Sequence, residues 1–152
     1  MTFRYYWEDF TVGRVFEYGA RTLSEADIVA FARDWDPQRF HVDAEAAKRT
    51  HFGGLVASGW HTGCVMMRLM CDAYLSDSSC VGSPGIEEWR FAQPVRPGDT
   101  LRYRATVLEA RPSASKPGHG IVKFRWELLN QRGEVAVSMI GAQFFLRREA
   151  TQ

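Results

Sequence analysis

Residues 55–75, LVASGWHTGCVMMRLMCDAYL, form a long stretch in which apolar residues fall on nearly every side of a helix. A helix that is hydrophobic all round is typical of one that other elements enclose. A membrane span is the competing interpretation, and His61, Arg68 and Asp72 within the stretch argue against it. We therefore expect a buried helix around which the rest of the chain folds.

The chain downstream of this helix has the period of two that β-strands require. Two segments alternate apolar with polar residues, and their apolar members are Leu101, Tyr103, Ala105 and Val107, then Val122, Phe124, Trp126 and Leu128. A polar loop is expected at 76–85, a strand at 86–95, a hairpin turn at 130–133 and a return strand at 135–146. This half of the chain therefore predicts antiparallel strands.

The chain upstream of the helix begins with a strand predicted over 12–18, followed by a helix that Ser24 caps. Asp27 stands three residues after Ser24, as in a capping box. The face of this helix that we expect to be buried holds Ile28, Phe31, Ala32 and Trp35. Pro37 ends the helix, because the residue before a proline is pushed out of the helical region.

The order of elements is a strand, a helix, a short helix, a long buried helix and then several antiparallel strands. A sheet must bury one face, and the 55–75 helix is the only element apolar enough to cover it. This predicts an α+β hot-dog fold, a curved antiparallel sheet wrapped around a central helix, in a single domain over 1–152. One helix cannot cover the whole edge of such a sheet, so we expect a homodimer, with higher oligomers left open.

The composition is that of an ordinary soluble domain. Of the 152 residues, 45% are hydrophobic and 24% are charged, and the net charge is +1. That balance gives no electrostatic reason to expect nucleic acid or a membrane as partner. Residues 1–7 lack the apolar core and cleavage site of a signal peptide, so the cytoplasm is the expected location.

The cysteines and histidines argue against disulfides and metal sites. Cys64, Cys71 and Cys80 are odd in number and form no CxxC, and the first two are expected to be small core residues. The histidines show no HExxH or other ligand spacing, so no metal is expected. The glycines form no phosphate-binding fingerprint, so no cofactor is expected either.

Residues 36–43, DPQRFHVD, place a carboxylate and an imidazole on an expected irregular loop, which ends where Asp43 caps a short helix over 44–48. Asp36 and His41 can converge there, and catalytic groups are disproportionately found on such loops. The pair can hold a water, one group removing its proton while the other delivers a proton elsewhere. The alternative is that Asp36 braces the loop and His41 is a packed histidine, and spacing alone leaves both open.

Residues 52–61, FGGLVASGWH, lead into the buried helix. Helix N-termini carry free N–H groups and positive potential, and glycine lets a ligand oxygen approach the backbone. This would suit a thioester carbonyl whose oxygen becomes negative during reaction. The alternative is that the glycines only make a tight turn and allow close packing.

With these motifs in place, the sequence resembles the MaoC-like family of hydratases and dehydratases, which includes the (R)-specific enoyl-CoA hydratases. The family's motif Asp-x-Asn-Pro-x-His-x-Asp is in register with Asp36, His41 and Asp43. Its Phe-Gly-x-x-Ile-Ala-His-Gly is similar to residues 52–59, and residues 91–99 resemble its strand and turn before the remaining sheet. The likeness covers nearly the whole chain.

Three residues depart from these motifs. Gln38 stands where the family has Asn, Arg39 where it has Pro, and Ser58 where it has His. Gln38 keeps the carboxamide, while the bulk of Arg39 is expected to reshape the loop. These departures bear on the choice of substrate more than on the class of reaction.

The resemblance implies hydration of an enoyl thioester, or dehydration of a 3-hydroxyacyl thioester, carried by CoA or by an acyl carrier protein. Asp36 and His41 would bind and activate the water, one taking its proton while the other serves the α-carbon. The backbone N–H of Gly59 would polarise the thioester carbonyl and stabilise the enolate. The residues expected to contact the substrate are Gln38, Phe40, Ser58 and Trp60.

Two other functions remain open on the same fold, because function lies in the site rather than in the fold. One is an acyl-CoA thioesterase, which usually places its carboxylate on the central helix, where this chain offers only Asp72 far from the N-terminus. The other is a non-catalytic acyl-binding subunit, which the Arg39 loop would motivate.

Overall fold

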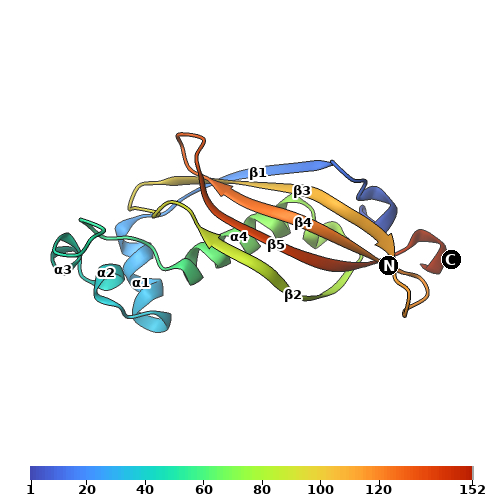
Figure 1. Cartoon of the computed structure of the whole chain (residues 1–152), viewed down its shortest axis with the longest axis horizontal. Helices are drawn as coiled ribbons and strands as arrows, with labels where there is room; N and C mark the ends of the chain where they lie inside the picture. The colour runs from blue at the N-terminus through green and yellow to red at the C-terminus, as the bar shows by residue number, and fades with distance from the viewer. Residues whose placement is uncertain (152) are drawn as a thin grey trace.

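A computed structural model describes residues 1–151 of the chain. Five strands, four α-helices and three short 3-10 helices follow one another in these residues (Figure 1). In chain order they are η1 (Trp7–Asp9), β1 (Val15–Thr22), α1 (Glu25–Trp35), α2 (Arg39–Val42), α3 (Ala44–Lys48), α4 (Gly59–Ala73), η2 (Leu75–Asp77), β2 (Cys80–Phe91), β3 (Thr100–Pro112), β4 (His119–Leu129), β5 (Val135–Leu146) and η3 (Arg148–Thr151).

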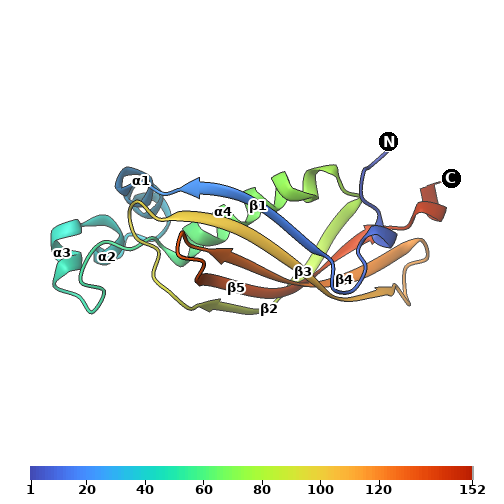
Figure 2. The same ribbon diagram turned by 90° about the horizontal axis from the view of Figure 1, so that it is seen from above.

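The strands form one antiparallel sheet in the order β1-β3-β4-β5-β2, and the sheet is not closed. The sheet curves around α4, while α1, α2 and α3 gather at one end of it (Figures 1 and 2). The two termini lie at the opposite end in both views. The predicted hot-dog architecture is confirmed.

The core lies between the sheet and α4. The alternating residues expected on 101–107 and 122–128 are buried, and their polar neighbours lie on the outer face of the sheet. Phe10, from the segment before β1, adds an aromatic ring that lies 4.2 Å from Phe145 and contacts Tyr74 edge-on. Full burial of such a side chain contributes about 1.5–3 kcal/mol, so the sheet and helix hold each other in place.

Helix α4 is shorter than expected and is not buried all round. It begins at Gly59, after the extended residues 55–58, and it exposes Trp60, Cys64 and Met67 on one side. The expectation that Cys64 is a core residue was therefore wrong. The reason is the open sheet, whose five strands enclose only one side of the helix.

Strand β2 begins at Cys80, so the polar loop expected at 76–85 was wrong over its second half. Residues 80–85 pair with β5 instead, with shifts in register at Gly82 and Gly85, both of which have positive φ. Pro84 lacks the N–H of a ladder donor and is tolerated because β2 is an edge strand. The strand also ends at Phe91, four residues before the expected end.

The region before α4 follows the prediction with three corrections. The Ser24 capping box is present, and Asp43 caps α3 as expected. The first strand runs over 15–22 rather than 12–18, and Trp35 is exposed rather than buried. Residues 39–42 form one helical turn, α2, within the segment that was expected to be irregular.

Within residues 1–151, no helix is both long enough and apolar enough to span a membrane.

Candidate active site

The candidate site lies where the end of the molecule that holds α1 and α2 meets the start of α4 (Figure 1). Helix α1 ends before Pro37, and α2 then returns the chain toward the sheet. Two backbone hydrogen bonds hold the segment before α4 in place, from Val56 N–H to the Phe40 carbonyl (3.0 Å) and from Ala57 N–H to the Val95 carbonyl (2.8 Å). The α2 turn is thus fixed beside the helix start.

His41 is buried, and its ring orientation is fixed from behind. Its Nδ1 lies 2.6 Å from the carbonyl oxygen of Val56. A carbonyl only accepts, so Nδ1 carries the proton, and Nε2 of the neutral ring is left as an acceptor. Nε2 lies 3.3 Å from Oδ2 of Asp36. In the neutral ring, the lone pair of Nε2 faces this carboxylate.

The hydrogen bonds around Asp36 favour its ionised form. Burial opposes its charge and is the largest single influence, but hydrogen bonds from Ser58 and Gln38, with a smaller effect of His41, outweigh it and lower the pKa of the carboxyl. Gln38 Nε2 donates to Oδ1 over 2.8 Å, and Ser58 Oγ donates to Oδ2 over 2.7 Å. A carboxylate and a neutral imidazole nitrogen, both acceptors, can together hold one water between them.

Ser58 joins this carboxylate to α4. It is completely buried, and its Oγ also accepts the backbone N–H of Trp60 over 3.2 Å as the N-cap of the helix. It was expected at the substrate, but its hydroxyl faces Asp36. Ser58, one of the three residues that depart from the family motifs, thus supports the pair of Asp36 and His41, which we call the dyad.

The first backbone N–H of α4, from Gly59, has no partner among the hydrogen bonds of residues 1–151. It lies in a pocket of about 330 Å³ with Asp36 and His41. A Cβ at Gly59 would collide with the ring of Phe91, so only glycine fits where the backbone of α4 passes this close to that ring. This pocket, which we call the dyad pocket, therefore combines two proton acceptors with a free backbone donor.

The other predicted residues divide between the pocket and its support. Gln38 and Trp60 line the pocket. Phe40 packs behind it, against the rings of His41 and Phe52. Among residues 1–151, no three His, Cys, Asp or Glu side chains are placed to hold a metal ion together.

Sequence analysis did not include Trp89 or Phe91 among the residues expected to contact the substrate. Both line the pocket from the end of β2. It also missed the Val56 carbonyl that sets the His41 proton. No local signal could reveal these contacts, because each depends on how distant segments pack.

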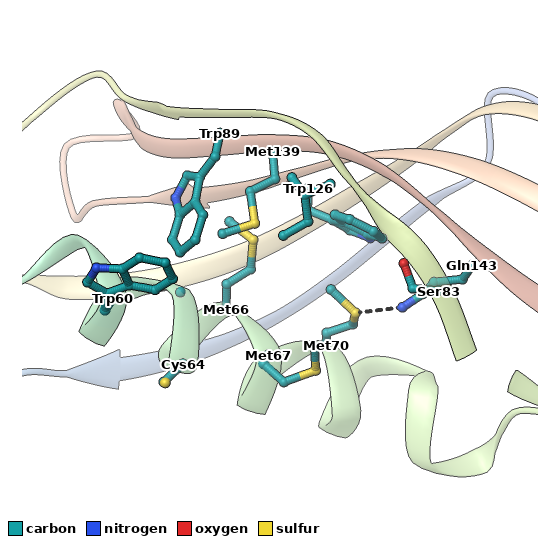
Figure 3. Close-up of a pocket in the computed structure, with 12 residues that line it drawn as sticks. Trp60, Cys64, Met66, Met67, Met70, Ser83, Trp89, Trp126, Met139 and Gln143 are labelled. Carbon is teal, nitrogen blue, oxygen red and sulfur yellow. Dashed lines mark hydrogen bonds between the residues drawn. The ribbon is translucent and has the colours of Figure 1, made fainter. Parts of the chain in front are cut away.

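A second cavity, of about 320 Å³, runs between α4 and β2 and shares Trp60 and Trp89 with the dyad pocket (Figure 3). Its lining is almost wholly apolar and includes three methionines of α4 and Met139 of β5. Trp60 and Trp89 stand at one end of it, with Ser83 and Gln143 toward the other. The dyad pocket thus opens beside an apolar channel.

Comparison with protein families gives one match, to the MaoC like domain, over residues 9–124. Among curated proteins, the uncharacterized protein YdeM of Bacillus subtilis is 32% identical over 111 residues, which are 73% of this chain and 79% of YdeM.

Solved structures give two further likenesses. The MaoC-like dehydratase from Rhodospirillum rubrum superposes with a TM-score of 0.88 at 41% identity, over 95% of this chain and 98% of that one. The R-hydratase PhaJ1 from Pseudomonas aeruginosa superposes with a TM-score of 0.73 at 25% identity, over 93% of this chain and 84% of that one.

Proposed function

Because the chain belongs to the MaoC-like dehydratase family, we propose that it is a hydro-lyase, which adds water to an enoyl thioester or removes water from a 3-hydroxyacyl thioester. The observation that carries the proposal is the 3.3 Å approach of His41 Nε2 to Asp36 Oδ2, beside the unpaired N–H of Gly59. The dehydratase and R-hydratase among the similar structures support the same reaction class.

The proton states suggest a division of roles. Asp36 is ionised and has no proton to give, so it orients the water by accepting one of its hydrogens. His41 Nε2 accepts the other hydrogen and acts as the general base. The Val56 carbonyl stabilises the imidazolium that forms, because the Nδ1–H already points at it.

The reaction then balances with one proton carried by His41. The water oxygen bonds to the β-carbon as its proton passes to Nε2, and the π electrons of the double bond move onto the thioester oxygen as an enolate. The Gly59 N–H donates to that oxygen. The imidazolium returns its proton to the α-carbon, the carbonyl re-forms, and one water has been added across the double bond. Dehydration follows the same steps in reverse.

The apolar channel beside the dyad is the proposed site for the acyl tail. It adjoins the dyad pocket at Trp60 and Trp89, which line both cavities, and the α- and β-carbons would lie beside these two rings. Its volume of about 320 Å³ is at the small end of the range for ligand sites, which favours short to medium acyl groups.

A homodimer is the proposed working unit. Strand β2 is a sheet edge that, among the residues the structure describes, pairs only with β5, and it exposes Val81, Ile86 and Phe91. An exposed apolar edge is a template for a second strand, and a second copy of the same edge satisfies it symmetrically.

The thioesterase alternative has less support. Asp72 lies 13 residues after Gly59, about 20 Å along α4 at 1.5 Å per residue. It is also engaged by Arg68, whose Nε lies 3.2 Å from its Oδ2. No carboxylate of α4 therefore stands near the dyad pocket.

The test compares hydration of crotonyl-CoA and a branched analogue by the wild type, Asp36→Asn and His41→Ala. The reaction is measured as the loss of the enoyl thioester absorbance. Each variant should lose about 10²–10⁴-fold in rate, the usual contribution of a positioned acid or base. Near-normal activity in both would sink the mechanism. Release of free thiol would indicate a thioesterase, and binding without turnover across a broad panel would indicate an acyl-binding subunit.

A further inference from the structure

The apolar channel, which we call the acyl channel because the acyl tail is proposed to lie in it, holds one buried polar side chain that the proposed reaction does not use. Gln143 of β5 is 4% exposed and lies toward the end of the channel away from Trp60 and Trp89 (Figure 3). A buried carboxamide without good partners is costly, so its presence in an apolar channel calls for a physical account.

The orientation of this amide is fixed by a chain of hydrogen bonds. The indole Nε1–H of Trp126 can only donate, and it donates to the Tyr74 hydroxyl over 3.2 Å. Burial raises the pKa of Tyr74 above its usual range, so the hydroxyl keeps its proton and donates it to Gln143 Oε1 over 3.0 Å. The carbonyl of Gln143 therefore faces Tyr74, and its NH₂ group faces the channel.

The NH₂ group lacks a strong acceptor. Its one hydrogen-bond partner among residues 1–151 is the thioether sulfur of Met70, 3.2 Å away, which is a weak acceptor (Figure 3). Ser83 Oγ donates to the Ala142 carbonyl over 2.6 Å and accepts the backbone N–H of Gly85 over 3.2 Å, and among the described residues no hydrogen bond joins it to Gln143. The channel thus ends in a donor that is ready for a better partner.

The charge of that partner follows from the lining. No lysine, arginine or histidine lines the channel among the described residues. A carboxylate there would be buried without a counter-charge, which costs far more than a neutral oxygen. The matching group is therefore an uncharged acceptor.

We propose that Gln143 is a specificity-determining residue, whose NH₂ donates to a carbonyl or hydroxyl oxygen carried by the distal part of the acyl group. This rests on the proposed function, since it assumes that the acyl tail occupies the channel. It assigns the substrate class as short to medium enoyl or 3-hydroxyacyl thioesters with a neutral oxygen near the chain end.

The test compares three enoyl-CoA substrates of equal chain length, with a plain, an oxo- or hydroxyl-bearing, and a carboxylate-bearing chain end. Wild type should favour the oxygenated substrates over the plain one by about tenfold in kcat/KM, the value of one buried hydrogen bond. The carboxylate-bearing substrate should be the poorest. Gln143→Met, which keeps the volume, should abolish the preference, and Met67→Leu in the same channel should retain it.

A binding measurement decides the matter independently of turnover and of variant folding. A saturated acyl-CoA with a ¹³C-labelled distal ketone binds to wild-type protein, and isotope-edited infrared spectra should show the ketone stretch shifted to lower frequency than in an apolar solvent. An unshifted band, or equal kcat/KM for plain and oxygenated substrates, overturns the role of Gln143. Absence of hydration with a shifted band would instead overturn the proposed reaction and leave the role of Gln143 supported.

Discussion

The hydroxyl of Ser58 donates to Asp36 over 2.7 Å while its oxygen accepts the backbone N–H of Trp60 over 3.2 Å. One buried side chain thus caps α4 and holds the carboxylate of the dyad. Ser58 therefore links Asp36 directly to the start of α4, in addition to the backbone hydrogen bonds that hold the α2 turn there.

Ser58→Ala should raise the pKa of Asp36, because it removes the stronger of the two hydrogen bonds that lower it. The ¹³C titration of the Asp36 carboxyl should therefore move to higher pH. The lost cap should also cost about 0.5–2 kcal/mol of unfolding free energy. Ser24→Ala is the matched control: it removes the cap of α1 and should leave the Asp36 titration unmoved. An unchanged titration in Ser58→Ala would remove Ser58 from the account of the dyad.

The same shift gives a pH dependence of stability. The pKa of Asp36 is lower in the folded than in the unfolded chain, so its contribution is present above the unfolded pKa and lost as pH falls through the folded one. Ser58→Ala reduces that contribution. The difference in unfolding free energy between wild type and Ser58→Ala should therefore become smaller in acid, where only the loss of the helix cap remains. Urea unfolding of both proteins at a series of pH values measures this difference.

Gly63→Ala should narrow the acyl channel without weakening α4. Alanine favours a helix interior by about 0.8–1 kcal/mol over glycine. A Cβ at this position, however, would lie 2.8 Å from ring atoms of Trp89, which must move. We expect an unchanged or higher Tm, with kcat/KM falling more for longer enoyl-CoA chains than for crotonyl-CoA. A chain-length profile identical to wild type would place the acyl tail elsewhere.

Val81→Lys should weaken the proposed dimer. Val81 is exposed on the β2 edge, where a lysine would be desolvated against a second copy. Sedimentation velocity should show a shift toward monomer in this variant, whereas Val12→Lys, an exposed valine outside every strand, should sediment as wild type. Equal sedimentation of the two variants would remove the β2 edge from the interface.

Phe10→Ala should be strongly destabilising, by about 3–5 kcal/mol. Phe10 is 1% exposed, and its ring contacts the ring of Tyr74, directly after α4, and the ring of Phe145 in β5. Phe3→Ala is the control, since the ring contact of Phe3 is with neighbouring Tyr6 alone among the described residues. Urea unfolding should separate the two, and comparable losses would mean that Phe10 does not join the N-terminal segment to the core.

The fold was predictable from sequence where local patterns act alone. The alternation on β3 and β4 and the Ser24 and Asp43 caps are confirmed because each depends on a few neighbouring residues. The exposed side of α4 was not predictable, since periodicity does not say how many strands enclose a helix. The start of β2 was missed because Gly82, Pro84 and Gly85 indicate a loop until β5 supplies their partner.

For the candidate site, the segment that holds Asp36 and His41 could be identified because it lies between two predicted helices and is in register with the family's motif. Their mutual approach and the shared pocket with Gly59 depend on the α2 turn, which was not expected. The proton on His41 Nδ1 depends on a carbonyl fifteen residues away in the chain. The sequence thus indicated the groups that we propose as catalytic, and packing decides how they are protonated and oriented.

The dyad pocket and the acyl channel have only Trp60 and Trp89 in common among the residues that line them. On the proposed roles, the reaction depends on residues 36–41 with Ser58 and Gly59, and the choice of substrate depends on the residues of α4, β2, β4 and β5 that line the channel. Relatives that keep the loop but change those faces would catalyse one chemistry on different molecules. On the proposed roles, agreement at Asp36 and His41 would therefore report the reaction of a relative, and agreement at positions such as Gln143 would report its substrate.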